Sequence, residues 1–302
     1  MATAKKHTKV GVIGLGIMGS SISSNLQKSG FDVYGVDLNA VARKKMKPLL
    51  SQVHADAAGI LTHSQKIISS LPSSKALMQT SHALCASKLA HQIKGTPILV
   101  ETSTLPLSDK LAARKILLAG GIHMIDAPLS GTGAQAKTKD LSIYASGDAK
   151  DVRAFNAIFA GFSRKHNFVG EFGNGMKIKL VANLLVAIHN VSTAEAILFG
   201  KKLGLNTKNL VRLVEDGAGG SRMFQVRGPM MVAKTWKQAT MKNEVWQKDM
   251  SIIYQALDEL NVPAPLFTAC IPIYKAAMSQ GHALNDTAAV YAVLEQMAGE
   301  AK

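Results

Sequence analysis

Short apolar runs alternate with helical patterns over the first 170 residues of the chain. Residues 10–13 form a β-branched run that ends at glycines, residues 17–28 have a helical pattern, and residues 31–36 supply the next strand. Further elements are predicted as strands at 66–69, 98–101, 122–125 and 141–145, and as helices at about 75–92 and 107–119. Strands separated by helices of about a dozen residues indicate βαβ units. The pattern predicts an α/β fold with a doubly wound parallel sheet.

The pattern changes after Gly170, where the strand signals end. Residues 174–203 have apolar positions around most of a helix circumference, so this long helix is expected to be buried between domains or between subunits. Further helical stretches follow at residues 206–216, 230–235, 243–260, 265–280 and 286–299. We predict two domains, residues 1–170 and an all-helical domain at 171–302. We also expect a homodimer or homotetramer in which the helical halves pack together.

A glycine-rich turn joins the first predicted strand to the first predicted helix. Its sequence is Gly14-Leu15-Gly16-Ile17-Met18-Gly19. Glycines at these positions allow a tight turn and let the backbone approach a pyrophosphate at the helix N-terminus, as in a Rossmann domain. Leu71-Pro72, after a later strand, is expected in a loop under the nicotinamide ribose.

Asp37 ends the second predicted strand, 18 residues after Gly19 (37 − 19). A carboxylate there can bind both ribose hydroxyls of NAD and would repel the 2′-phosphate of NADP, so we predict NAD as cofactor. Arg43, one turn into the following helix, leaves room for some use of NADP. The alternative is a plain glycine turn beside an Asp37 that only caps a helix.

Two loops at the ends of later strands carry hydroxyl groups. One contains Ser103-Thr104 in the segment ETSTLP, and the other contains Ser130-Gly131-Thr132 in DAPLSGTG. Ligands bind at the carboxyl ends of the strands in open α/β sheets, and hydroxyls with free backbone N–H groups suit a carboxylate. Helix capping is the alternative, because Ser and Thr are common at helix N-termini.

The start of the long helix places two polar residues within an apolar run. Lys179 and Asn183 are four residues apart and share one helix face, whereas Lys177 points elsewhere. Burial lowers the pKa of a lysine, and a general base that works near neutral pH requires such a pKa. The alternative is a lysine whose ammonium group reaches solvent along its own aliphatic stem.

These motifs, in this order and spacing, resemble the β-hydroxyacid dehydrogenase family, typified by 3-hydroxyisobutyrate dehydrogenase. The resemblance runs from about residue 10 to about 297 and includes Lys248-Asp249-Met250, which is similar to a Lys-Asp-Leu segment of the family. It implies a Rossmann domain, a long interdomain helix and a helical domain like the C-terminal domain of 6-phosphogluconate dehydrogenase. It also implies reversible NAD(P)-linked oxidation of small 3-hydroxy acids.

The resemblance also implies a role for each matching residue. Lys179 matches the catalytic lysine, and Asn183 matches one of the helix asparagines. Ser130, Gly131 and Thr132 match the substrate-binding loop. The residues matched to cofactor binding are Gly14, Leu15, Gly16, Ile17, Met18, Gly19, Asp37, Leu71, Pro72, Ser103, Thr104 and Lys248.

The sequence departs from the family pattern at several positions, which puts the usual substrate in doubt. Ala182 stands where an asparagine is frequent, Thr132 and Lys139 stand at usual glycine positions, and Met176 replaces a frequent glutamine. Residues 184–195 and 221–224 are similar to the branch that acts on four-carbon sugar acids such as threonate. Two alternatives stay open: a reductase of a short aldehyde acid, such as glyoxylate or succinic semialdehyde, and a non-catalytic scaffold, against which Lys179 argues.

Charge and composition change this picture little. The net charge is +15 and the pI is near 9.8, which attracts anions, yet the basic residues are scattered and aromatic residues are only 5% of the chain. This argues against nucleic acid as the main partner. Two cysteines, the lack of an apolar core in the first ten residues and the polar residues that interrupt the most apolar stretch predict a cytoplasmic protein without a membrane span. No metal cluster is expected.

Overall fold

The computed structural model describes residues 8–300, and the basic segment 1–7 lies outside the described residues. The chain divides into two compact units, Met1–Lys179 and Leu180–Lys302, here called unit 1 and unit 2. The division lies within one long helix, whereas the sequence places a domain boundary at 170.

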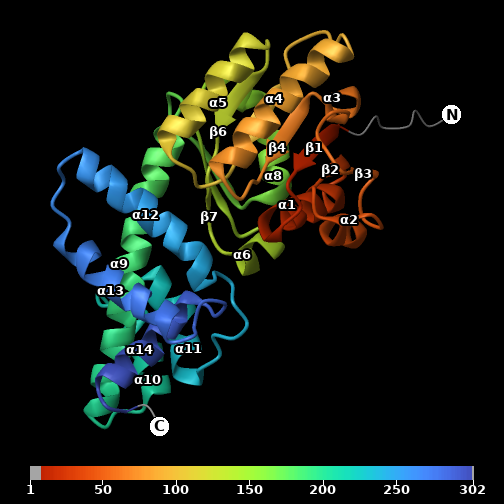
Figure 1. The fold of residues 1–302 in the computed structure, drawn as a ribbon. Helices are drawn as coiled ribbons and strands as arrows, with labels where there is room; N and C mark the ends of the chain where they lie inside the picture. Colours follow the sequence, from red (N-terminus) through yellow and green to blue (C-terminus); the bar gives the residue numbers. More distant parts are fainter. Residues whose placement is uncertain (1–7, 301–302) are drawn as a thin grey trace. The chain divides into compact units, whose positions relative to one another are not determined.

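Unit 1 is built on a parallel six-stranded sheet with the strand order β3-β2-β1-β4-β5-β6 (Figure 1). The strands are β1 (Lys9–Ile13), β2 (Asp32–Val36), β3 (Gln52–His54), β4 (Lys66–Ser69), β5 (Ile98–Glu101) and β6 (His123–Asp126). The connecting helices are α1 (Ile17–Lys28), α2 (Ala40–Met46), α3 (Ile60–His63), α4 (Ser74–Ala90) and α5 (Leu107–Ala119). The predicted doubly wound α/β fold is confirmed.

Neighbouring residues of one strand pack on opposite faces of this sheet. In β1, Val12 belongs to one buried apolar cluster and Ile13 to another, and in β4 the same holds for Ile68 and Ile67. Side chains alternate between the two faces of a strand, so a strand that is covered on both sides needs apolar residues at consecutive positions. This explains why these strands are short continuous apolar runs.

A second, three-stranded sheet follows β6. It comprises β7 (Leu129–Ser130), β8 (Ser142–Ala145) and β9 (Lys165–Phe168), in the order β7-β8-β9. The predicted strand at 141–145 is therefore not a strand of the parallel six-stranded sheet, because β8 pairs antiparallel with β7 and parallel with β9. The remaining helices of unit 1 are α6 (Gly133–Lys137), α7 (Ala149–Ala154) and α8 (Asn156–Phe162).

Helix α9 (Asn174–Lys202) runs from unit 1 into unit 2. One face of the helix, which includes Ala187 and Ala194, is buried. The side chains of Val181, Leu185 and Phe199 are exposed to solvent. Among the described residues, α9 is the one helix that is long and apolar enough to cross a membrane, with 39% of its most apolar window buried. Because the core helix of a soluble protein meets the same criteria, the absence of a membrane span stays a prediction.

The regular elements in the described part of unit 2 are all helices, apart from an isolated bridge between Lys242 and Asp286. Besides α9, unit 2 contains α10 (Thr207–Val214), α11 (Arg222–Ala233), α12 (Asn243–Glu259), α13 (Pro265–Ser279), the 3₁₀ helix η1 (Thr287–Ala289) and α14 (Val290–Met297). Helix α11 begins eight residues before the predicted stretch 230–235, although Gly228 and Pro229 lie inside it. The side chain of Ser221 accepts a hydrogen bond from Phe224 N and starts the helix, so a good N-cap outweighs the two helix-breaking residues.

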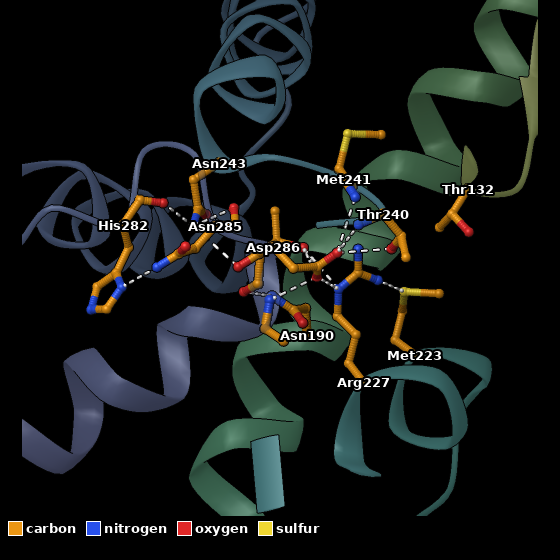
Figure 2. A network of polar contacts seen from close by, with 12 residues as sticks. Thr132, Asn190, Met223, Arg227, Thr240, Met241, Asn243, His282, Asn285 and Asp286 are labelled. Carbon is orange, nitrogen blue, oxygen red and sulfur yellow. Dashed lines mark hydrogen bonds and ion pairs between the residues drawn. The ribbon is translucent and has the colours of Figure 1, made fainter. Parts of the chain in front are cut away.

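A buried ion pair holds the core of unit 2 together (Figure 2). The Nε of Arg227 on α11 donates to Asp286 Oδ1 at 3.1 Å, and both side chains are buried. Figure 2 shows how Asp286 also accepts from Thr240 and Met241, in the loop between α11 and α12. The pair therefore fixes that loop against η1.

Candidate functional site

The glycine turn after β1 has the geometry that a dinucleotide-binding turn needs. Gly14 has φ +91°, and a Cβ at this position would lie 2.1 Å from Ser70 O. A Cβ at Gly19 would lie 1.7 Å from Gly14 O, so this glycine lets α1 pack closely against the turn. A Cβ at Gly16 would meet no atom within 4 Å, so Gly16 faces open space at the start of α1. The turn therefore fits a pyrophosphate at the helix N-terminus.

The other residues of the turn divide between core and surface. Leu15 is buried, Met18 is half-buried, and Ile17 is exposed at the first position of α1. The buried Leu15 side chain anchors the turn in the apolar core of unit 1.

Asp37 lies beside this turn. Its Oδ2 accepts from Leu15 N at 2.6 Å and its Oδ1 accepts from Asn39 N at 2.7 Å. The cap of α2 is Asn39, whose side chain accepts from Val41 N, so helix capping does not account for Asp37. Each carboxylate oxygen has a further lone pair, so Asp37 retains the capacity to accept bonds from ribose hydroxyls.

Arg43 of α2 lies close to the same position. Its guanidinium donates to Asp37 O and to Leu38 O, each at 2.8 Å. The arginine therefore lies at the end of β2, next to Asp37.

The loops that follow β4 and β5 are joined by Ser103. Its hydroxyl accepts from Leu71 N at 2.7 Å, and its backbone N–H donates to the buried Glu101 carboxylate at 2.6 Å. The N-cap position of α5 is Pro106, so neither Ser103 nor Thr104 occupies the N-cap position of that helix. The structure thus brings Leu71 and Ser103 together, and Pro72 is exposed.

Thr132, in the loop after β7, is a helix cap. It forms a capping box with Gln135 at the start of α6, in which Thr132 N donates to Gln135 Oε1 at 2.9 Å. Gly131 has φ +136°, and a Cβ there would lie 2.6 Å from the Leu141 side chain, so this position requires glycine. Ser130 is half-buried at the end of β7. The capping alternative thus applies to Thr132 and not to Ser103.

Lys179 and Asn183 lie on the buried face of α9, with 9% and 4% of their surface exposed, while Lys177 is exposed. The amide of Asn183 donates to Asp249 Oδ2 on α12 at 3.0 Å. Lys248 is next to it in the chain, with its Nζ 3.5 Å from Asp249 Oδ1. Asp249 therefore fixes the orientation of the Asn183 amide in unit 2.

Sequence reasoning missed Lys110 and Ser146, and it assigned no role to Asp126. Lys110 and Asp126 form a fully buried ion pair, and Ser146 is completely buried beside it. Lys110 occupies an ordinary position in an amphipathic helix, so no sequence pattern marks it. Among residues 8–300, no group of three or more His, Cys, Asp or Glu side chains is arranged to hold a metal ion.

The chain is similar to known proteins over almost its whole length. Residues 9–170 match the family described as NAD binding domain of 6-phosphogluconate dehydrogenase. Residues 173–294 match NAD-binding of NADP-dependent 3-hydroxyisobutyrate dehydrogenase. 2-(Hydroxymethyl)glutarate dehydrogenase from Eubacterium barkeri is 28% identical over 98% of this chain and 97% of its own length. L-threonate dehydrogenase from Cupriavidus necator is 27% identical over 93% of this chain and 94% of its own length.

Solved structures share the fold. The structure of Mycobacterium tuberculosis 3-hydroxyisobutyrate dehydrogenase with L-serine has a TM-score of 0.84 at 22% identity and covers 95% of this chain and 99% of that one. The two family matches confirm the predicted family and the use of a nicotinamide dinucleotide. The chain therefore belongs to the β-hydroxyacid dehydrogenase family, whose members are NAD(P)-dependent oxidoreductases that act on CH–OH groups.

Proposed function

We propose that the protein reversibly oxidises the 3-hydroxyl group of a small carboxylate, with Lys179 as the general acid/base. The observation that carries the proposal is the burial of Lys179, in the same unit as the dinucleotide turn and on the opposite side of α9 from the exposed Lys177. The nicotinamide cofactor, when bound, supplies the hydride acceptor or donor.

The proton of the substrate hydroxyl is transferred by a residue of this chain. In the oxidative direction the neutral amine of Lys179 accepts the proton of the substrate hydroxyl, and in reduction the ammonium returns it. Asn183 lies one turn further along α9, and its amide is held by Asp249. We assign to Asn183 the orientation of the substrate hydroxyl or of the lysine.

The loop at residues 130–132 is proposed to hold the substrate carboxylate. Ser130 provides a hydroxyl, and Gly131 lets the backbone adopt a conformation that other residues rarely adopt. The hydroxyl and the N–H of Thr132 are engaged with Gln135, so Thr132 acts by shaping the loop. The Ser-Gly-Thr sequence makes this loop bulkier than a Ser-Gly-Gly loop, which favours a small substrate.

The substrates named for two relatives indicate which class of substrate to test. These relatives act on 2-(hydroxymethyl)glutarate and L-threonate, which are carboxylates that also carry hydroxyl groups. Asp37 supports a preference for NAD, because its carboxylate would face the 2′-phosphate of NADP. Arg43, bound to the carbonyl groups of residues 37 and 38, lies near enough to support some use of NADP.

We further propose a homodimer or homotetramer. The exposed apolar side chains on α9, Val181, Leu185 and Phe199, are the observation that supports it, since a large exposed apolar patch marks an interface. Light scattering that finds only a 32 kDa species at micromolar concentration would contradict it.

Cys85 and Cys270 are both free thiols, which supports the proposed cytoplasmic location.

The decisive experiment assays C3–C5 hydroxy acids and aldehyde acids with NAD and with NADP, first for the wild-type protein. Lys179→Ala should lower kcat roughly 10²–10⁴-fold, the usual contribution of general acid–base catalysis, with little change in NAD affinity. Lys179→Arg should not restore the rate, because a guanidinium stays protonated. The matched control is Lys177→Ala, which should keep most of the activity. An active Lys179→Ala enzyme would overturn the assignment of the base.

A further inference from the structure

A buried cluster of Lys110, Asp126 and Ser146 holds the first turn of α9. Lys110 Nζ on α5 donates to Asp126 Oδ1 at 2.7 Å, and both side chains are fully buried. The other oxygen of this carboxylate, Oδ2, accepts from Met176 N at 2.8 Å. A single carboxylate at the end of β6 thus joins α5 to the start of α9.

Ser146, which directly follows β8, is the third member of the cluster. Its hydroxyl accepts from Gly173 N at 3.2 Å and from Gly175 N at 3.0 Å, and it lies 3.2 Å from Asp126 Oδ2. The backbones of Asp126 and Ser146 also form an isolated antiparallel bridge. The first N–H groups of a helix have no acceptors within the helix. Here Ser146 accepts from Gly175 N, and Asp126 accepts from Met176 N.

This attachment leaves the start of α9 little freedom to move. A Cβ on Gly175 would lie 2.3 Å from Tyr144 O and 3.0 Å from Asp126 Oδ2, so the helix backbone is in close contact with β8 and β6. The negative charge of Asp126 at the helix N-terminus also interacts favourably with the helix dipole. Lys179 follows Met176 by three residues, so it lies one turn from the attached amide and nearly above it.

The same carboxylate lies four residues before Ser130 in the chain. Pro128 and the strand β7 connect Asp126 to the loop at 130–132, and β7 pairs with β8, which leads to Ser146. The substrate loop and the start of the lysine helix are therefore both attached to one buried cluster, composed of Lys110, Asp126 and Ser146.

We propose that Lys110, Asp126 and Ser146 are positioning residues, which set the distance between Lys179 and the substrate loop. The inference rests on the proposed function, because it assumes that Lys179 transfers the proton. Displacing a catalytic group by about 1 Å can lower a rate about 10²-fold without any loss of contact to the substrate. The cluster therefore affects kcat more than the binding of substrate or cofactor.

Ser146→Ala is the primary test, because it removes the hydrogen bonds from Gly173 N and Gly175 N at the start of α9 and leaves no buried charge unpaired. Its matched control is Ser64→Ala in the same unit, since the Ser64 hydroxyl also bonds backbone groups, Lys9 O and Lys66 N, at a point away from α9. Ser146→Ala should lower kcat about 10–100-fold, while KM for the hydroxy acid and the Kd for NADH, measured by its fluorescence, change less than threefold. Ser64→Ala should leave all three unchanged.

Hydrogen exchange provides a readout that does not depend on turnover. Ser146→Ala should speed exchange of the amides at residues 173–179, and Ser64→Ala should not. Equal exchange in both variants, or faster exchange together with a wild-type kcat, overturns the positioning proposal. If wild-type protein oxidises no acid in the panel, the proposed function fails, and unchanged exchange in Ser146→Ala then also overturns the attachment on which the inference depends.

A second variant separates charge from attachment. Lys110→Met/Asp126→Asn removes both charges together, so the fold does not retain an unpaired buried ion, and the asparagine oxygen still accepts from Met176 N. Its kcat should be higher than that of Asp126→Ala at equal NADH affinity. If Asp126→Ala is folded and as active as the double variant, the bond from Met176 N does not position the lysine.

Discussion

In the part of the chain that the structure describes, unit 1 and unit 2 each contain a basic side chain buried against an aspartate, but the two ion pairs contact different backbone segments. In unit 1 the carboxylate of Asp126 accepts from Lys110 and from a backbone amide of α9. In unit 2 the carboxylate of Asp286 accepts from Arg227, from Thr240 N and from Ala288 N. One pair ends on the helix that carries the proposed base, and the other closes a loop onto η1.

The comparison shows that burial of charge alone does not indicate a functional residue. Both pairs are almost completely shielded from solvent, and removing one member of either pair leaves a buried ion without its counter-charge. The two pairs differ in how far from Lys179 they contact α9. Asn190, the residue of α9 that bonds to Thr287, follows Lys179 by 11 residues (190 − 179), roughly 16 Å along the helix axis. We therefore expect the unit 2 pair to affect stability and the unit 1 pair to affect both stability and rate.

The largest effect is expected from Asp286→Asn. It leaves the buried guanidinium of Arg227 without its counter-charge, which should lower the free energy of unfolding by about 3–5 kcal/mol. Both tryptophans, Trp236 and Trp246, are buried in unit 2, so their fluorescence during denaturation by urea reports this unit. The kcat of the folded enzyme should stay within about threefold of the wild-type value.

Arg227→Met/Asp286→Asn is the control for this prediction. Removing both charges should recover much of the lost stability, because neither ion is then buried alone. A kcat that falls as far in Asp286→Asn as in Ser146→Ala would remove the proposed difference between the two ion pairs.

Acid should lower the free energy of unfolding of unit 2 by protonating the carboxylate of Asp286. Burial alone would raise the pKa of Asp286, but the charge of Arg227 and the hydrogen bonds from Met241 and Ala288 outweigh it and hold this pKa below the usual value. Since the pKa is lower in the folded chain than the value of about 3.9 expected when unfolded, the stabilisation is present above about pH 4. It should be lost as the pH falls further, through the folded pKa.

The measurement is the tryptophan-detected stability between pH 7 and pH 3. Burial also lowers the pKa of His282, so this histidine should cause a separate loss that begins below about pH 6.5. Asp286→Asn should flatten only the part below pH 4, and His282→Gln only the part above it. A wild-type curve that does not fall below pH 4 would show that Asp286 contributes no net stabilisation.

The smallest effect is expected from the capping box in unit 1. Gln135→Ala and Thr132→Ala each remove one side of the cap of α6 and should lower the free energy of unfolding by about 1 kcal/mol, measured by calorimetry. Because Thr132 acts on the loop through the cap that it shares with Gln135, KM for the acid should change equally in both variants. A rise in KM that is confined to Thr132→Ala would instead assign its hydroxyl to the substrate.

Much of the fold was predictable from local patterns. The six-stranded sheet needs apolar residues at consecutive positions, so β1, β4 and β5 are visible as apolar runs such as residues 10–13. Strands β3, β7 and β9 were missed because they are short or polar, as in Lys165–Phe168, and depend on pairing with a neighbouring strand. The start of α11 was missed because Gly228 and Pro229 weaken the local helical signal.

The sequence by itself determined the family, the dinucleotide turn and the candidate lysine, because each depends on residue types at a fixed spacing. Only the tertiary structure separated Ser103, which joins two loops, from Thr132, which caps a helix, since both alternatives use the same residue types. It alone brought Lys110, Asp126 and Ser146 together with the first turn of α9. The partners of a buried charge come from distant segments of the chain, so their identity is decided by packing and not by local sequence.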